Sequence, residues 1–213
     1  MKRNDLSLLL QELKDLHRSR RKAILARLLE FQAVPESEYF YELAYCILTP
    51  QTSAEHAAQV IDTLREASFH TVAFDPEPIL RTPATYIRFH KTKSRHLLKL
   101  KEDFSTIVDA LRRGDEPHVV REWLVKHVLG VGYKEATHFL RNVGRSGGLA
   151  ILDRHILRSL KRYSAIRVIP STLSRKKYLA VERSFIRFSR RIGISLDELD
   201  LLFWSMETGA IRK

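Results

Sequence analysis

The chain has 213 residues, of which 37 are Lys or Arg, 25 are Asp or Glu and nine are His, so its formal net charge is +12. Its single cysteine, Cys46, excludes a disulfide framework and any all-cysteine zinc or iron–sulfur site. No stretch approaches the roughly 18 apolar residues of a membrane span, and the N-terminal stretch is too charged for a signal peptide. We therefore expect an intracellular protein with no membrane partner and no cofactor.

The positive charge is concentrated in one window of the chain. Residues 141–191 contain 14 Lys and Arg but only two acids, Asp153 and Glu182, whereas the remaining residues are balanced. Phosphate contacts by Lys and Arg release condensed counterions, so a localised positive field favours a polyanionic partner, and nucleic acid is the first candidate. A basic face that only keeps the protein in solution is the alternative reading of the charge.

Apolar residues recur at helical spacing along the chain. Residues 74–83 contain three prolines and are expected to form a loop at which the chain passes between domains. No alternating strand pattern occurs, so the predicted fold class is all-α. In chain order, helices are expected over residues 5–31 with a break near 18–21, over 39–48, from Ser53 onward, within 91–112, over 122–128 and 133–143, after Asp153, over 178–192, and over 196–207 behind a capping box of Ser195 and Glu198.

Five of the eight glycines lie between residues 130 and 148, and two of them belong to the tetrapeptide Leu129-Gly130-Val131-Gly132 between two predicted helices. Glycines permit a tight turn and leave backbone N–H groups uncovered at the start of the next helix. Such amides bind anions together with the helix dipole, so Gly130, Val131 and Gly132 are candidates for contact with a DNA phosphate. An ordinary turn between two helices is the alternative.

Two chemically active side chains follow this turn. Lys134 lies in the first turn of the next helix, whose positive end disfavours a further positive charge, and a neutral lysine amine is the species that forms a Schiff base. A phosphate contact or a merely solvated lysine are the alternatives. Asp153 comes nineteen residues later, after an apolar run. It has the position of a helix N-cap, a role that would also fix its carboxylate in place.

The segments around these residues resemble a known family. His127–Ala136, with Leu-Gly-Val-Gly-Tyr-Lys, and Ala150–Arg158, with Leu-Asp-Arg-His, are similar to the helix-hairpin-helix DNA glycosylases that have a catalytic lysine and aspartate. Lys134–Gly144 and Ala150–Arg158 resemble in particular the type-2, mainly archaeal 8-oxoguanine DNA glycosylase/lyases. The match continues, in order, through residues 46–54, 88–93 and 204–213, so it covers most of the chain. The cysteine count separates the chain from the iron–sulfur members of the superfamily.

The resemblance implies a fold of two helical subdomains with an active-site cleft between them and a helix-hairpin-helix motif at about residues 121–143. It further implies an N-terminal helical part over residues 1–75 that packs with the C-terminal helix or helices. A central helical domain over 76–195 would carry the hairpin and Asp153. Residues 196–213 would form a C-terminal helix and a tail that reaches the base pocket.

The implied activity is that of a bifunctional DNA N-glycosylase and AP lyase. It would excise 8-oxoguanine from a flipped nucleotide. Lys134 would attack C1′ of the sugar to form the Schiff base, Asp153 would stabilise positive charge on the sugar, and β-elimination would then cleave the strand. The implied partner is double-stranded DNA containing oxidised guanine, and the protein is expected to act as a monomer.

The resemblance also assigns base and DNA contacts. The expected faces that sandwich the damaged base are Trp204 and Phe89, and Lys213 would help to read 8-oxoguanine. Gln51 would fill the gap left by the flipped nucleotide. No histidine has metal-site spacing, and the one ion that the resemblance allows is a monovalent cation on hairpin carbonyls. Further candidates for DNA contact are His138, Arg141, Arg154, His155 and Arg158. His138 and Arg141 could instead brace the site.

Two other functions are compatible with parts of the pattern. A monofunctional glycosylase for alkylated bases would share the fold and use water as its nucleophile, which needs the aspartate but not Lys134. A non-catalytic helix-hairpin-helix DNA-binding protein would need neither Lys134 nor Asp153 at this spacing.

Overall fold

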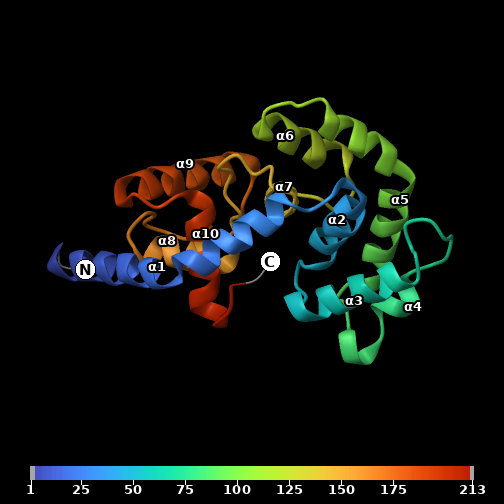
Figure 1. Cartoon of the computed structure of the whole chain (residues 1–213), viewed down its shortest axis with the longest axis horizontal. Helices are drawn as coiled ribbons and strands as arrows, with labels where there is room; N and C mark the ends of the chain where they lie inside the picture. The colour runs from blue at the N-terminus through green and yellow to red at the C-terminus, as the bar shows by residue number, and fades with distance from the viewer. Residues whose placement is uncertain (1–2, 212–213) are drawn as a thin grey trace. The chain divides into compact units, whose positions relative to one another are not determined.

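The computed structural model describes residues 3–211, and all regular secondary structure in that range is helical, which confirms the all-α prediction (Figure 1). Short 3-10 helices cover Glu36–Glu38 and Pro83–Thr85. The α-helices are α1 (Arg3–Gln32), α2 (Tyr39–Leu48), α3 (Ala54–Glu66), α4 (Glu77–Leu80), α5 (His90–Arg112), α6 (Pro117–His127), α7 (Tyr133–Asn142), α8 (Arg154–Arg162), α9 (Arg175–Ile192) and α10 (Leu196–Thr208).

Two compact units divide the chain. The first contains the residues up to Ala33 and those from Gly144 onward, and the second contains Val34–Val143. These limits differ from the domain boundaries expected at 75/76 and 195/196. The difference arises because α2 packs with α5 and α7 of the second unit and α3 packs with α2 and α4, while the chain after Gly144 folds with α1.

The first unit is built around α10, which packs against α1, α8 and α9. Phe203 is fully buried on α10, and its ring stacks on those of Tyr163 and Phe185, at centroid distances of 5.6 and 5.9 Å. Aromatic rings in this arrangement add stability beyond the apolar area that they bury. The core of this unit therefore fixes α10, which carries Trp204, relative to α8, which begins at Asp153 in the same unit.

The second unit is built around α2, whose ten residues are all buried. A helix that is apolar on every side needs partners on every side, and α3, α5 and α7 all pack against α2 in this unit. The C-terminal end of α2 is thereby placed beside the first turns of α5 and α7, and Lys93 and Lys134 both reach it.

Two local expectations need correction. The break expected in α1 near residues 18–21 is wrong: the helix is continuous, because this stretch has no Gly or Pro and consists of residues that tolerate helix well. Arg20 and Arg21 on the continuous helix also bond to α10, through Ser205 and Glu198. The proline-rich stretch at 74–83 is not all loop, because Glu77–Leu80 forms one helical turn with a proline in its first turn, where the missing N–H costs little.

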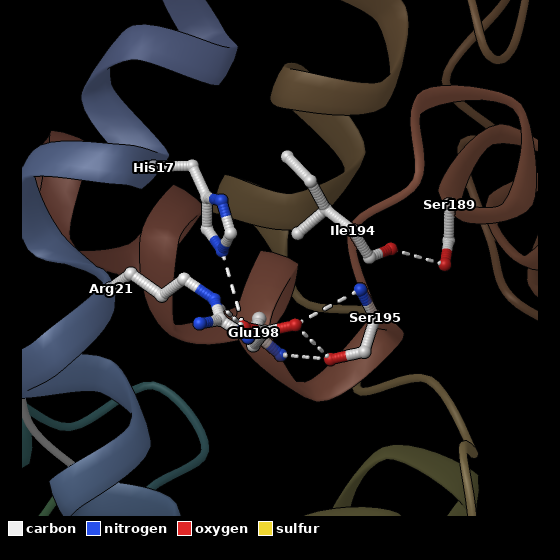
Figure 2. A network of polar contacts seen from close by, with 6 residues as sticks. All are labelled: His17, Arg21, Ser189, Ile194, Ser195 and Glu198. Carbon is white, nitrogen blue, oxygen red and sulfur yellow. Dashed lines mark hydrogen bonds and ion pairs between the residues drawn. The ribbon is translucent and has the colours of Figure 1, made fainter.

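A polar network joins α1 to the start of α10 (Figure 2). The predicted capping box is present: the Ser195 hydroxyl and amide both donate to Glu198 Oε2, at 2.7 and 3.2 Å, and Glu198 N donates back to Ser195 Oγ at 3.3 Å. Glu198 Oε1 lies 3.3 Å from both His17 Nε2 and Arg21 Nε. Burial of the carboxyl would raise the pKa of Glu198, but the hydrogen bonds from Ser195 and His17 outweigh it, so the pKa lies below its usual value.

Glu198→Ala is therefore expected to lower the free energy of unfolding by about 1–3 kcal/mol at pH 7, because it removes the cap partner and leaves buried His17 facing an empty site. A group with a lowered folded-state pKa stabilises the protein above its unfolded pKa and loses that contribution as pH falls through the folded value. Urea unfolding should accordingly show a smaller difference between wild type and variant at pH 3 than at pH 7. Asp15→Asn, at an exposed ion pair on the same helix, is the control and should change stability by less than about 0.5 kcal/mol.

Candidate active site

The predicted hairpin lies between α6 and α7, which pack against each other. Gly130 has a φ of +82°, a left-handed conformation that L side chains rarely adopt. Two of the turn's amides are already paired: Val131 N donates to Val128 O at 3.3 Å, and Gly132 N donates to the Glu135 carboxylate at 3.1 Å. The amide of Gly132, which the sequence led us to regard as open to a phosphate, thus has a carboxylate as its partner.

Gly130 also packs against α5. A Cβ added at this glycine would lie 2.8 Å from Cε1 and 2.9 Å from Cγ of His96, and closer still to Nδ1. Burial, aided by the charges of Arg95 and Lys93, lowers the pKa of His96, which favours the neutral form of its ring. The hairpin turn therefore packs directly on the imidazole ring of His96.

Gly130→Ala is expected to destabilise the protein by about 2–4 kcal/mol and to weaken DNA binding, because it combines a strained φ with a clash against His96. The matched control is Gly114→Ala, since Gly114 has a φ of +73° but no atom within 4 Å of an added Cβ. That control should cost only about 1–2 kcal/mol and leave DNA affinity unchanged. Thermal unfolding and duplex binding measured on both variants check this, and equal effects of the two variants would contradict the role of the His96 contact.

Lys134 is the second residue of α7, and its side chain is half-buried. Its Nζ donates a long hydrogen bond of 3.4 Å to Thr49 Oγ1, which itself donates to the carbonyl of Cys46 at 3.0 Å. The amine is thus placed at the C-terminal end of the buried helix α2. Among the described residues it forms no ion pair with a carboxylate, so the amine stays available for chemistry on a substrate.

Gln51 follows α2 in the turn Thr49–Ser53. It is exposed and has a φ of +57°, a left-handed conformation that costs a non-glycine residue about 1–2 kcal/mol. Strained backbone of this kind persists where neighbouring contacts hold it, and it is concentrated at binding sites. The structure is therefore compatible with the expectation that Gln51 projects outward toward DNA.

Phe89 stands at the start of α5 in the same unit. It is 51% exposed, has a φ of +61°, and lies with its ring 5.0 Å from the guanidinium of Arg88. An exposed phenylalanine in a strained conformation is unfavourable unless its ring has a partner. With this exposure, the ring of Phe89 is not part of the apolar core.

Asp153 is the N-cap of α8, as expected. Its Oδ1 accepts from the amides of His155 and Ile156, both at 2.8 Å, so the cap uses one carboxylate oxygen and does not need Oδ2. The two donors and the positive end of the helix stabilise negative charge at this position. The side chain is half-buried, so it is fixed in direction and still reachable.

Trp204 and His155 lie close to each other in the first unit. The two rings meet edge to face at a centroid distance of 6.5 Å, and His155 Nδ1 is 3.6 Å from Glu207 Oε2. Arg154 Nε donates to His155 Nε2 at 3.2 Å. Trp204 is half-buried, which leaves part of its indole ring accessible, whereas Lys213 lies outside the described residues.

The other residues expected to contact DNA differ in how exposed their side chains are. Arg154 and Arg158 are exposed on α8. His138 and Arg141 are only 7% and 5% exposed, and the His138 ring packs edge-on against Tyr45. Of the two roles expected for this pair, burial favours bracing of the site over direct contact with phosphates.

A basic face runs along α9, within the charged window of the sequence. The first turn of α9 contains no acidic residue, although cations at a helix N-terminus are unfavourable. Such a placement is typical of a surface selected for binding an anion. The exposed cations of this face are Arg175, Lys176, Lys177, Arg183, Arg187, Arg190 and Arg191.

The sequence analysis missed Lys93. It is only 6% exposed, and its ammonium donates to the carbonyls of Leu48 and Pro50, both at 2.7 Å, and to Thr52 Oγ1 at 3.1 Å. Burial, followed by repulsion from Lys134, lowers the pKa of Lys93 to about 8, although Glu135 partly opposes this. Its only signal in the sequence was its place in the matching segment 88–93, since most helical lysines are solvated.

Neither a metal centre nor a membrane span was found in the described part of the chain. Residues 3–211 contain no cluster of three or more His, Cys, Asp or Glu side chains that could hold a metal ion. None of the described helices is both long and apolar enough to cross a membrane.

The described chain is helical, with a glycine hairpin followed by Lys134 in the first turn of α7 and by Asp153 at the N-cap of α8. This combination defines the class of helix-hairpin-helix DNA glycosylases. Within it, the sequence model of the 8-oxoguanine DNA glycosylase family matches residues 24–194, and the chain belongs to this family.

Individual relatives match along nearly their whole length. An 8-oxoguanine DNA glycosylase/AP lyase of Korarchaeum cryptofilum is 35% identical, over 91% of each chain, and one of Methanocaldococcus jannaschii is 35% identical over 97% of this chain and 100% of its own. The crystal structure of the Methanocaldococcus jannaschii 8-oxoguanine glycosylase/lyase, in complex with a 15mer DNA containing 8-oxoguanine, superposes with a TM-score of 0.86 at 34% identity. It covers 97% of this chain and 100% of that one.

Proposed function

We propose that the protein is a bifunctional DNA repair enzyme that excises 8-oxoguanine from DNA and cleaves the strand at the resulting site. The observation that carries this proposal is Lys134, a half-buried amine behind the hairpin, in a chain whose full-length relatives are 8-oxoguanine DNA glycosylase/AP lyases. A glycosylase that used water as its nucleophile would have no use for this amine.

The reaction begins with the damaged nucleotide turned out of the helix, because C1′ is unreachable within the stack. Neutral Lys134 attacks C1′, the C1′–N9 bond breaks, and the base leaves with the bonding electrons and takes up a proton. The amine gives up one proton, O4′ takes up a proton as the sugar ring opens, and a protonated Schiff base is left between Nζ and C1′. Removal of a proton from C2′ then expels the 3′ phosphate, and the strand is cut by β-elimination.

Asp153 supplies a fixed negative charge for this sequence of steps. Positive charge develops on the sugar as the glycosidic bond breaks, and a preorganised carboxylate stabilises it with no reorganisation. The N-cap bonds of Oδ1 hold the side chain in place and leave Oδ2 for the substrate.

Base recognition is assigned to the aromatic rings of Phe89 and Trp204. Phe89 is exposed in a left-handed conformation, and Trp204 has an accessible indole ring beside His155. Stacking on such rings is worth about 1–3 kcal/mol per base. Lys213 is assigned to reading the oxidised base.

The proposed partner is double-stranded DNA that contains oxidised guanine. Gln51, the hairpin residues Gly130 to Gly132, and Arg154 and Arg158 would contact it, with the basic face of α9 adding attraction that depends on salt. We infer a monomer that acts in the cytoplasm or nucleoid and needs no organic cofactor. The backbone carbonyls of the hairpin are a donor set that suits a monovalent cation, and such an ion would stiffen the turn without taking part in the chemistry.

Borohydride trapping on a duplex with a single 8-oxoguanine tests this function. The wild type should give a covalent adduct and a cut strand, and an undamaged duplex of the same sequence should give neither. Release of the free base with no adduct would indicate a monofunctional glycosylase. Binding without any product would indicate a non-catalytic DNA-binding protein.

A further inference from the structure

The buried ammonium of Lys93 is an unusual feature of the second unit. It is bound by three oxygens, those of Leu48, Pro50 and Thr52, all of them uncharged. A buried lysine usually has a carboxylate to offset the loss of its hydration. These three bonds use all three protons of the ammonium, so the group is fixed in direction as well as in place.

The three oxygens belong to the segment Leu48–Thr52, which joins α2 to α3. Leu48 is the last residue of α2, where an unpaired carbonyl and the negative end of the helix attract a cation. Pro50 and Thr52 stand on either side of Gln51, which has a φ of +57°. Lys93 therefore holds the segment on both sides of its one strained residue.

The same segment also carries the partner of the proposed nucleophile. Thr49 Oγ1 accepts from Lys134 Nζ at 3.4 Å and donates to Cys46 O at 3.0 Å. Two lysine amines from α5 and α7 thus converge on one segment of five residues. The position of this segment therefore decides where the amine of Lys134 lies, because Thr49 is its hydrogen-bond partner.

We propose that Lys93 is a positioning residue for the Schiff-base chemistry: its ammonium fixes Leu48–Thr52 so that Thr49 orients the amine of Lys134 and Gln51 is presented to DNA. This inference rests on the proposed function, since it takes Lys134 as the nucleophile. Lys93 itself forms no bond to the substrate.

Lys93→Met tests the proposal, because methionine has a similar length but cannot donate a hydrogen bond or carry charge. At saturating 8-oxoguanine duplex, the single-turnover trapping rate should fall about 10- to 100-fold, as expected when a reacting group loses its orientation. The pH–rate profile should also lose its step near pH 8, where the ammonium of Lys93 gives up its proton. Affinity for an undamaged duplex should stay near the wild-type value.

Two further variants keep the test decisive. Lys99→Met removes an exposed charge from the same helix and should match the wild type in rate and pH profile. Thr52→Val removes one of the three acceptors without burying a new charge, and should slow trapping by a smaller factor if Lys93→Met fails to fold. A rate and pH profile unchanged in folded Lys93→Met, or unchanged in Thr52→Val, would overturn the inference. Absence of trapping by the wild type would instead overturn the proposed function.

Discussion

Lys134→Gln is expected to abolish the borohydride-trapped adduct and to slow strand cleavage by about 10⁴-fold or more, the scale seen when a covalent nucleophile is removed. Glutamine keeps most of the length and polarity of the side chain, and its amide can still reach the Thr49 hydroxyl that Lys134 contacts at 3.4 Å. Its nitrogen is not nucleophilic, so the Schiff base cannot form. Stability and DNA affinity should therefore change little.

Single-turnover cleavage and trapping on the 8-oxoguanine duplex measure this effect, together with binding of the same duplex. Lys99→Gln, which removes an exposed lysine of α5, should leave all three quantities unchanged. A persistent adduct with Lys134→Gln would show that another amine attacks C1′, and Lys93 would then be the first candidate because of its position beside Lys134 and its lowered pKa.

The helices could be predicted from sequence because each has its own apolar stripe or cap. The capping box of Ser195 and Glu198 and the N-cap at Asp153 are both present as expected, since these signals depend only on residues within one turn. The continuity of α1 could not be judged in this way. Arg20 and Arg21 look like an interruption of the apolar pattern, and only their bonds to Ser205 and Glu198 show why the helix continues.

The arrangement of units was less accessible because it depends on contacts between distant segments. The composition of the Phe74–Pro83 stretch suggested a boundary there, but α2 is buried on all sides and packs on both α5 and α7. Because α2 packs on these helices and α3 packs on α2, both α2 and α3 belong to the unit Val34–Val143. Local composition carries no information about such pairing.

Within the candidate site, the sequence indicated candidate residues but not how exposed they are. Lys134 and Asp153 were predicted from spacing and resemblance, and the structure gives each a fixed setting. His138 and Arg141 were expected either to contact phosphates or to brace the site, and their burial favours bracing, because the helical face they share with Lys134 turns inward beyond its first turn. Lys93 was missed because nothing in the sequence near it shows that the carbonyls of Leu48 and Pro50 would accept hydrogen bonds from its ammonium.

Asp153→Asn is expected to lower the rate of 8-oxoguanine excision by about 10²–10³-fold, the usual effect of removing one preorganised electrostatic contact. Asparagine caps helices nearly as well as aspartate, so the bonds from the amides of His155 and Ile156 should persist through its carbonyl oxygen. Stability should therefore fall by less than about 0.5 kcal/mol. The variant would separate the charge of Asp153 from its capping role.

Asp153→Ala removes both contributions and should add a loss of about 1 kcal/mol in the free energy of unfolding. Ser195→Ala is the matched control, because Ser195 caps α10 in the same unit through a bond from Glu198 N. It should cost a similar amount of stability while leaving the excision rate at the wild-type value. If Asp153→Asn excised the base at the wild-type rate, or if Ser195→Ala slowed excision as much as Asp153→Ala, the carboxylate would act only as a helix cap and the charge stabilising the sugar would have to come from another group.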